Sequence, residues 1–223
     1  MSPHEPPPRL IIFHTGSPET STFYQRWYRL MSLLETKIEV KTARHITALP
    51  ALIEDPTTIL IVADSELALP KNTFYWDIVL AFVYYGGICI TACEFYRVDP
   101  EHIAPFFARA GLSWTSGLFR QHRRFEFNPA AEGGPEGGML DGRAPQIYRA
   151  GGRPIWNVEE RHIWYSFDDS GEGPRAVGTT TTTTTTTMVA MAGFGRGWLG
   201  YTGSKGSCRK TIDIIVAMCG LSA

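Results

Sequence analysis

The feature that most constrains the fold is a regular alternation of short apolar runs with helical segments over the first half of the chain. Each run is apolar at almost every position, as in strands that helices cover on both faces. The predicted strands are Leu10–Phe13, Ile38–Val40, Thr58–Ala63 and Ile88–Ala92. The predicted helices between them are Thr22–Glu35, Ile46–Ile53 and Phe74–Tyr85. Such a βαβαβ series predicts a parallel sheet with right-handed crossovers.

Two of these helices have different apolar patterns. In Thr22–Glu35 the apolar residues recur at spacings of three and four, which predicts one buried stripe. Phe74–Tyr85 is apolar nearly all round, with Asp77 as its one charged residue, and we expect a buried helix that Asn72 or Thr73 caps. At about 12 residues it is shorter than the roughly 20 that a membrane span needs.

The second half of the chain predicts strands and loops. A short helix over Glu101–Ala110 ends the alternation, and from Arg123 onward the sequence is mostly extended. Ala131–Gly152 contains seven glycines and two prolines, which predicts an exposed, mobile loop. The remaining predicted elements are strands at Ile155–Val158 and His162–Phe167, a hairpin of Met188–Ala192 with Trp198–Thr202, and a final helix over Cys208–Cys219.

Thr179–Thr187 is an uninterrupted run of nine threonines. Threonine favours extended backbone, but a uniform run offers no apolar face that would fix the register of a strand. We therefore expect an edge strand of slipping register or a loop.

Composition narrows the possible partners and the compartment. The chain has 223 residues and a formal net charge of -1, so no overall field attracts nucleic acid or an anionic membrane. A small molecule or a protein is the expected partner. The four cysteines are too few for a disulfide framework, which favours a reducing compartment, by default the cytoplasm. We expect a disordered lead over residues 1–8 and a single domain over residues 9–223.

Two stretches of the sequence resemble a known superfamily. Ile59–Asn128 contains the strand into Ala92-Cys93-Glu94-Phe95, and Val189–Leu221 contains Gly195-Arg196-Gly197-Trp198-Leu199-Gly200-Tyr201. Both resemble fungal proteins of the class I glutamine amidotransferase-like superfamily. The resemblance implies a flavodoxin-like, three-layer α/β domain with a mostly parallel central sheet and a C-terminal β-hairpin plus helix. Relatives often continue the last tyrosine motif with an Asp and an Asn, where this chain has Gly203–Ser207.

Cys93 is the first candidate for a catalytic residue. The resemblance implies a nucleophilic cysteine directly after such a strand, at a tight turn that glycines flank on both sides. Here Thr91 and Phe95 take the flanking positions, so the signature of a nucleophile elbow is broken. Family members place the histidine base after the last core strands, but no histidine follows His162. The triad of the family therefore cannot form in its usual way.

Polar residues at the ends of the predicted strands offer another arrangement. His14, Asp64 and Cys93 each follow a strand, with Glu66 and Glu94 nearby, and parallel strands end at one edge of a sheet. These residues could form a Cys/His pair with acidic support, with Cys93, His14 and Glu94 as catalytic candidates and Asp64 as a ligand-binding candidate. Alternatively, His14 and Asp64 cap the loops that follow the strands.

The last candidates precede the final helix. Lys205 and Ser207 lie where backbone amides and an ammonium group could bind an anion, or Ser207 could cap the helix. Cys89 and Cys93 share one side of a strand, but nothing in the sequence completes a metal site. Gly193–Gly197 lacks the spacing of a dinucleotide-binding loop, so no cofactor is expected.

Three hypotheses remain open from the sequence. The first is an amidotransferase-like domain without a complete triad that binds a small ligand or a protein. The second is a Cys93-dependent hydrolase or amidotransferase in which His14 or His162 is the base. The third, suggested by the threonine run, is an inert product of a drifting gene, which cooperative thermal unfolding would contradict.

Overall fold

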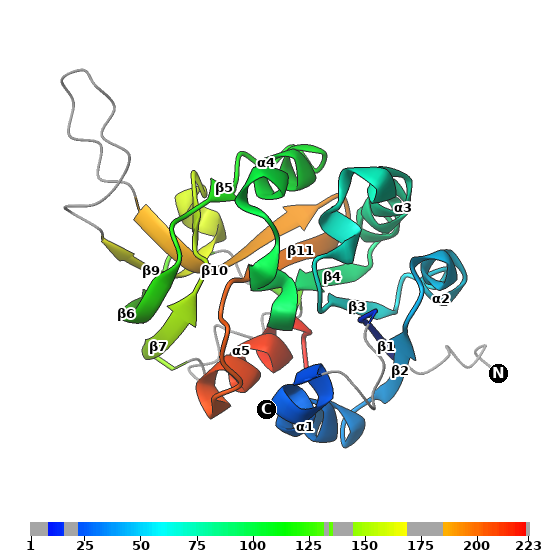
Figure 1. The fold of residues 1–223 in the computed structure, drawn as a ribbon, viewed down its shortest axis with the longest axis horizontal. Coiled ribbons are helices and arrows are strands. Elements are labelled where there is room, and N and C mark those ends of the chain that lie inside the picture. Colours follow the sequence, from blue (N-terminus) through cyan, green and yellow to red (C-terminus); the bar gives the residue numbers. More distant parts are fainter. Residues whose placement is uncertain (1–8, 16–21, 132–133, 136–144, 169–184, 222–223) are drawn as a thin grey trace.

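The structure of the protein is a computed structural model, and it describes residues 9–15, 22–131, 134–135, 145–168 and 185–221. One half of its sheet consists of parallel strands in the order β2-β1-β3-β4-β11 (Figure 1). These strands are β1 (Arg9–Phe13), β2 (Glu39–Ala43), β3 (Ile59–Val62), β4 (Ile88–Thr91) and β11 (Gly197–Thr202). The first and fourth predicted strands therefore lie in one sheet, as the sequence predicts.

The other half of the sheet continues from β11 with antiparallel pairs in the order β10-β9-β6-β7. Two short strands, β5 and β8, lie beside this path, and β8 pairs with β10. The bounds are β5 (Thr115–Ser116), β6 (Arg120–Phe127), β7 (Ile147–Gly152), β8 (Ile155–Trp156), β9 (Ile163–Asp168) and β10 (Thr185–Phe194). The predicted hairpin is β10 with β11, and it joins the two halves.

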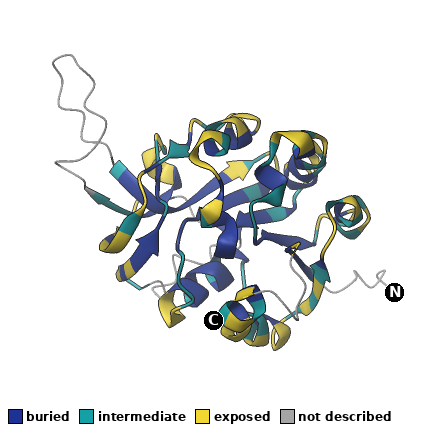
Figure 2. Cartoon of the chain, in the orientation of Figure 1, coloured by how far each residue is buried: buried dark blue, intermediate teal, exposed yellow. Residues whose placement is uncertain are grey.

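Helices cover both faces of the sheet and create two cores. Helices α1 (Thr22–Glu35) and α5 (Arg209–Met218) pack on one face, and α2 (Leu49–Leu52), α3 (Thr73–Tyr84) and α4 (Pro100–Ala108) pack on the other (Figures 1 and 2). Alternate residues of each parallel strand enter opposite cores: Ile61 and Ile90 face α1 and α5, whereas Leu60 and Cys89 face α3. This alternation follows from the period of two in a strand. The predicted burial of Ile61, Ile90, Val79 and Phe82 is confirmed.

Short 3₁₀ helices connect the larger elements. They are η1 (Ile46–Ala48), η2 (Glu66–Ala68), η3 (Pro70–Asn72), η4 (Cys93–Arg97) and η6 (Glu160–His162). The predicted helix at Ile46–Ile53 is η1 continued by α2. None of the helices in the described ranges is long and apolar enough to cross a membrane.

The glycine-rich region departs most from its prediction. Ile147–Gly152 is strand β7 at the edge of the sheet, where the composition predicts a loop; residues 132–133 and 136–144 lie outside the described part. Tyr148 and Ala150 are buried on one side of β7, and this alternation outweighs the glycine content. Gly152 is needed where it stands, because a Cβ there would overlap the carbonyl oxygen of Gly203.

The end of the threonine run also differs from its prediction. Thr185–Thr187 begin β10, a central strand with β9 on one side and β8 or β11 on the other, and not an edge strand. Thr186 is buried and its Oγ1 accepts a hydrogen bond from Trp156 Nε1 at 3.3 Å. Residues 179–184 lie outside the described part of the chain.

Helix α3 is buried on one side only. Trp76 and Val79 are in the core, but Phe74 within the helix and Tyr85 directly after it are each 68% exposed. Asn72 is the N-cap residue of α3, as predicted, but its side chain donates to the Glu66 backbone oxygen and makes no capping hydrogen bond. The helix is therefore less buried than its almost entirely apolar sequence predicts.

Candidate functional site

The carboxyl edge, where the parallel strands end, brings together most of the predicted site residues. The register aligns Phe13 with Val62, and Val62 with Thr91. The residues that follow these strands, His14, Asp64 and Cys93, therefore emerge at one edge of the sheet. This is the edge at which open α/β sheets usually bind ligands.

Cys93 forms a sharp turn with its own backbone. Its φ is +58°, in the left-handed region that non-glycine residues rarely adopt. The hydrogen bonds from Ala92 N to Val62 O and from Glu94 N to Ala63 O continue the β3–β4 pairing on either side of it. Cys93 thus makes a sharp turn directly after its strand, as its position predicts, without the glycines that flank a nucleophile elbow.

Buried side chains and internal hydrogen bonds occupy the space around the Cys93 turn. Thr91 is fully buried and its Oγ1 donates to the Gly200 carbonyl at 3.1 Å, and Phe95 is buried against Tyr201. In hydrolases with a nucleophile elbow, the backbone N–H after the nucleophile helps to bind the oxyanion. Here that group, Glu94 N–H, donates to the Ala63 carbonyl at 2.9 Å. It is not available to a substrate in this conformation.

The Cys93 thiol lies inside the protein. Its residue is 1% exposed, and burial, together with the nearby Glu94 and Cys219, raises the pKa of the thiol well above its usual value. Within the described residues, the structure gives Cys93 Sγ no hydrogen-bond partner. A neutral, buried thiol is a poor nucleophile because the thiolate is the reactive form.

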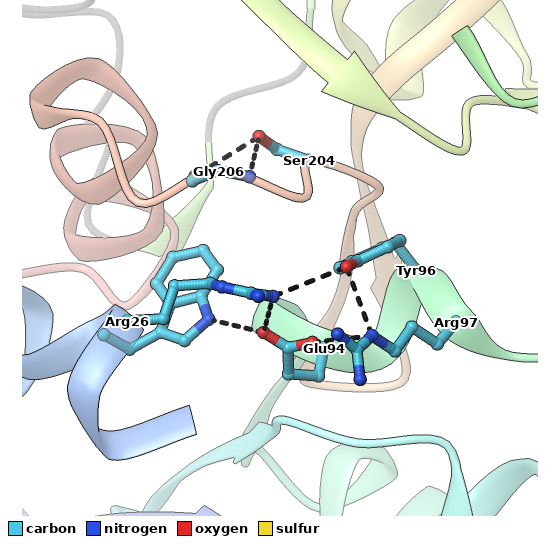
Figure 3. A network of polar contacts seen from close by, with 7 residues as sticks. Arg26, Glu94, Tyr96, Arg97, Ser204 and Gly206 are labelled. Carbon is cyan, nitrogen blue, oxygen red and sulfur yellow. Dashed lines mark hydrogen bonds and ion pairs between the residues drawn. The ribbon is translucent and has the colours of Figure 1, made fainter. Parts of the chain in front are cut away.

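Glu94 is the centre of a polar network at the same edge (Figure 3). Its Oε1 accepts hydrogen bonds from Arg26 Nη1 at 2.6 Å and from Trp27 Nε1 at 3.2 Å. Arg97 Nε lies 2.8 Å from Oε2 as an ion pair, but it donates its hydrogen bond to the Tyr96 hydroxyl at 3.2 Å, and Oε2 accepts none from the described residues. Glu94 is 6% exposed, so this carboxylate is buried and held by two guanidinium groups.

The residues around Glu94 are not among the predicted site residues. Trp27 is predicted only as part of the buried stripe of its helix, and Arg26 precedes it on the edge of that stripe. Arg97 lies three residues after Glu94, the spacing at which side chains meet on a helix. The adjacency of Glu94 and Arg97 could have been read from the sequence, whereas the contact with α1 depends on how the helix packs.

His14 follows β1, which is not adjacent to β4, the strand that leads into Cys93. The order β1-β3-β4 places β3 between them, so their backbones are about two strand spacings, ~10 Å, apart. The His14 ring stacks on Phe23 of α1 with ring centroids 4.2 Å apart. His162 precedes β9, three strand positions from β4, or ~14 Å. An imidazole beside Cys93 is therefore not supplied by a neighbouring strand.

The Asp64 carboxylate accepts hydrogen bonds from the two loops that meet at this edge. Its Oδ2 accepts bonds from the backbone and hydroxyl of Thr15 at 2.6 and 2.7 Å, and its Oδ1 accepts one from Glu66 N at 3.0 Å. Asp64 thus ties the end of β1 to the loop after β3, as the capping alternative predicts.

Lys205 and Ser207 have different surroundings. Lys205 Nζ lies 5.2 Å from the centre of the Phe119 ring, a cation–π contact. The residue that caps α5 is Cys208, without a side-chain capping bond, so Ser207 does not cap this helix.

The described residues also line two cavities. A hollow of about 710 Å³ is formed by β6, β9 and the start of β10, with Arg124, Glu126 and Phe167 in its lining. A smaller one of about 160 Å³ lies beside Trp76, His102 and Phe106. Neither is lined by Cys93 or Glu94. In the described ranges, no three His, Cys, Asp or Glu residues are grouped to hold a metal ion.

Comparison with known proteins identifies the fold. No protein-family model and no curated protein matches the chain. Among solved structures, it is similar to a ThuA-like protein from Bacteroides uniformis, with a TM-score of 0.60, 13% identity and coverage of 95% of this chain and 89% of that one. A protein from Thermoplasma acidophilum that is assigned to GMP synthase, as one of its subunits, has a TM-score of 0.54, 12% identity and coverage of 97% and 94%.

A third similarity is with one part of a larger enzyme. A β-galactosidase from Bacillus circulans matches 96% of this chain with a TM-score of 0.54 and 11% identity, but the match covers 31% of that enzyme. The ThuA-like protein and the GMP synthase protein have glutamine amidotransferase-like folds, and this chain shares that α/β fold.

Proposed function

We propose that this chain is a binding domain built on a glutamine amidotransferase-like, flavodoxin-like fold, which recognises a small ligand at its carboxyl edge without using Cys93 as a nucleophile. The strand order β2-β1-β3-β4-β11 supports the flavodoxin-like assignment, because it is the order 2-1-3-4-5 of such sheets. A reducing compartment such as the cytoplasm suits its free cysteines.

The observation that carries the proposal is the state of the Cys93 turn. Cys93 Sγ is buried with a raised pKa, and the N–H of Glu94 is already bonded to Ala63 O. Covalent catalysis needs an accessible thiolate, a base and free oxyanion donors. The Cys93 thiol is not exposed, and the backbone N–H that would bind an oxyanion is already bonded within the protein. These two features favour a binding function over acyl transfer.

Thiol labelling of the native protein tests this proposal. Cys208 is exposed and is the internal reference, whereas Cys93 is buried. We expect iodoacetamide near neutral pH to label Cys208 much faster than Cys93, as mapped by mass spectrometry over time. We also expect no hydrolysis of glutamine or of an activated ester above that of a Cys93→Ala variant. Labelling of Cys93 faster than Cys208 would contradict the proposal.

One observation favours a second candidate, a Cys93-dependent hydrolase or amidotransferase. The left-handed φ of Cys93 is costly for a non-glycine residue, and such strain often marks functional sites. If an activity were found that Cys93→Ala abolishes with the fold intact, this candidate would replace the first. His14→Ala against His162→Ala would then identify the base.

A further inference from the structure

We propose that four basic side chains at the carboxyl edge, Arg26, Arg97, Arg153 and Lys205, form a binding site for a small oxyanion, a metabolite that carries a phosphate or a carboxylate group. We call this set the basic edge. The inference rests on the proposed binding function and specifies the class of its ligand.

The basic edge is continuous in space although its members come from four parts of the chain. Arg26 and Arg97 meet at Glu94, and both guanidinium groups contact the Tyr96 hydroxyl, at 3.5 and 3.2 Å (Figure 3). Arg153 Nε donates to the Tyr96 backbone oxygen at 3.1 Å. Tyr96 thus connects the arginines.

Aromatic contacts extend the same surface to Lys205. The rings of Tyr96 and Phe119 have centroids 6.4 Å apart, and Lys205 Nζ lies 5.2 Å from the Phe119 centroid. Phe119 is 41% exposed, so a flat apolar surface lies beside the ammonium group. A ligand with a ring or chain beside its oxyanion could pack there.

The charges of the basic edge are not balanced. The basic edge has four positive side chains and contacts one carboxylate, Glu94, which Arg26 and Arg97 share. Within the described residues, Arg153 and Lys205 form no ion pair, since Arg153 donates to a carbonyl and a hydroxyl and Lys205 lies over a ring. The nearby carboxylates of Asp64 and Glu66 are bonded elsewhere, to Thr15 and Lys71.

An excess of positive charge is unusual here because the whole chain carries a formal charge of -1. Guanidinium groups that converge on one place suit the planar, bidentate recognition of carboxylate and phosphate. An anion bound at the basic edge would reduce the repulsion between the cations. The local charge, more than the overall charge, therefore determines which ligand is attracted.

Calorimetric titration of the full chain with inorganic phosphate and, separately, with citrate tests the proposal. We expect saturable binding of at least one of them that weakens as sodium chloride is added. Phosphate alone would indicate a phosphoryl ligand, and citrate alone a polycarboxylate. No saturable binding of either would overturn the proposal.

Matched variants locate the binding. Lys205→Gln and Arg97→Gln should each raise the Kd about tenfold, the loss of one charged hydrogen bond. Arg124→Gln is the control, because Arg124 and Arg97 are both 53% exposed and each is paired with a glutamate, but Arg124 lies on β6. An equal loss in Arg124→Gln would contradict a specific site.

The experiment separates this inference from the proposed function. If neither anion binds while Cys93 stays unreactive, the oxyanion assignment fails and a binding domain for another ligand remains. If anions bind but Cys93 proves to be a nucleophile, the proposed function fails and the basic edge stands. Thermal unfolding of each variant shows whether a lost affinity comes from a lost fold.

Discussion

Arg26 Nη1 on α1 lies 2.6 Å from Glu94 Oε1, which follows β4, and 68 residues separate the two in the chain. This contact fixes the helix against the carboxyl edge. The Glu94 side chain is 7% exposed and the Arg26 side chain is 35% exposed, so the pair is shielded from solvent on the glutamate side. Removal of one partner leaves a charge in a place that water does not reach.

The first prediction concerns this pair. Arg26→Gln should lower the free energy of unfolding by about 1–3 kcal/mol, because the buried carboxylate loses its shortest hydrogen bond. Glu94→Gln in the same background should restore part of the loss. Urea unfolding of the two single variants and the double variant measures the coupling. The exposed pair Arg124–Glu126 is the control, with an expected coupling below about 1 kcal/mol; equal coupling in both pairs would contradict the burial argument.

The second prediction uses the backbone of Cys93. At φ +58°, glycine is favoured over alanine by about 1 kcal/mol, whereas within a strand it is disfavoured by a similar amount. Cys93→Gly should therefore be at least as stable as Cys93→Ala. At Cys89, which is equally buried but within β4, Cys89→Gly should be less stable than Cys89→Ala. Thermal unfolding of the four variants tests this, and the same order at both positions would show that Cys93 is not strained.

The third prediction compares two glycines of one loop. A Cβ at Gly203 would overlap the carbonyl oxygen of Arg153, whereas a Cβ at Gly206 would meet nothing within 4 Å. Gly203→Ala should lower the free energy of unfolding by more than about 2 kcal/mol, since backbone must move. Gly206→Ala should change it by less than about 0.5 kcal/mol. Chemical denaturation of both variants measures these changes. Similar losses of stability in the two variants would show that the loop backbone can shift to accept a side chain at Gly203.

The fourth prediction is a loss of stability in alkali. Burial raises the pKa of Tyr148 to about 12, while an unfolded tyrosine loses its proton near pH 10. Between these values the unfolded state binds fewer protons, so the free energy of unfolding falls by about 1.4 kcal/mol per pH unit for this group. Below about pH 10 the contribution is complete, and it disappears as the pH rises through the folded pKa.

Substitution isolates this contribution from that of the other buried groups. Tyr148→Phe should flatten the fall between about pH 10 and 12, whereas Tyr28→Phe, at an exposed tyrosine, should leave the curve unchanged. Denaturant unfolding at several pH values measures both. A wild-type curve that is flat in this range would show that Tyr148 is not protected from ionisation.

The parallel half of the fold could be predicted because its information is local. Runs such as Leu10–Phe13 and Ile59–Val62 are apolar at every buried position, and strands between two helix layers need no other signal. Strand β7 could not be predicted in the same way, because its glycines mask the alternation of Tyr148 and Ala150. Its pairing with β6 is decided by distant residues.

The site could be predicted only in part for a related reason. The position of Cys93 and Glu94 after a strand is local and follows from the sequence. Which side chains surround them is set by packing: Arg26 arrives from α1, and Arg153 arrives from the segment between β7 and β8. The rule that glycines flank an elbow concerns side-chain space, whereas the turn is made by the φ of Cys93 alone.

The place of β11 in the sheet has a consequence for how the chain reaches its native state. Tyr201 pairs with Thr91, so the strand that completes the parallel half is made on the ribosome more than a hundred residues after the strand it contacts. Until Gly197–Thr202 has emerged, β4 has an unpaired side, and an apolar open strand edge invites pairing with other chains. The chain loses the conformational entropy of closing this long loop before the β4–β11 contacts can stabilise it. We therefore expect slow folding. The nascent chain is therefore most prone to aggregate late in its synthesis, and a chaperone that shields β4 would act in that interval.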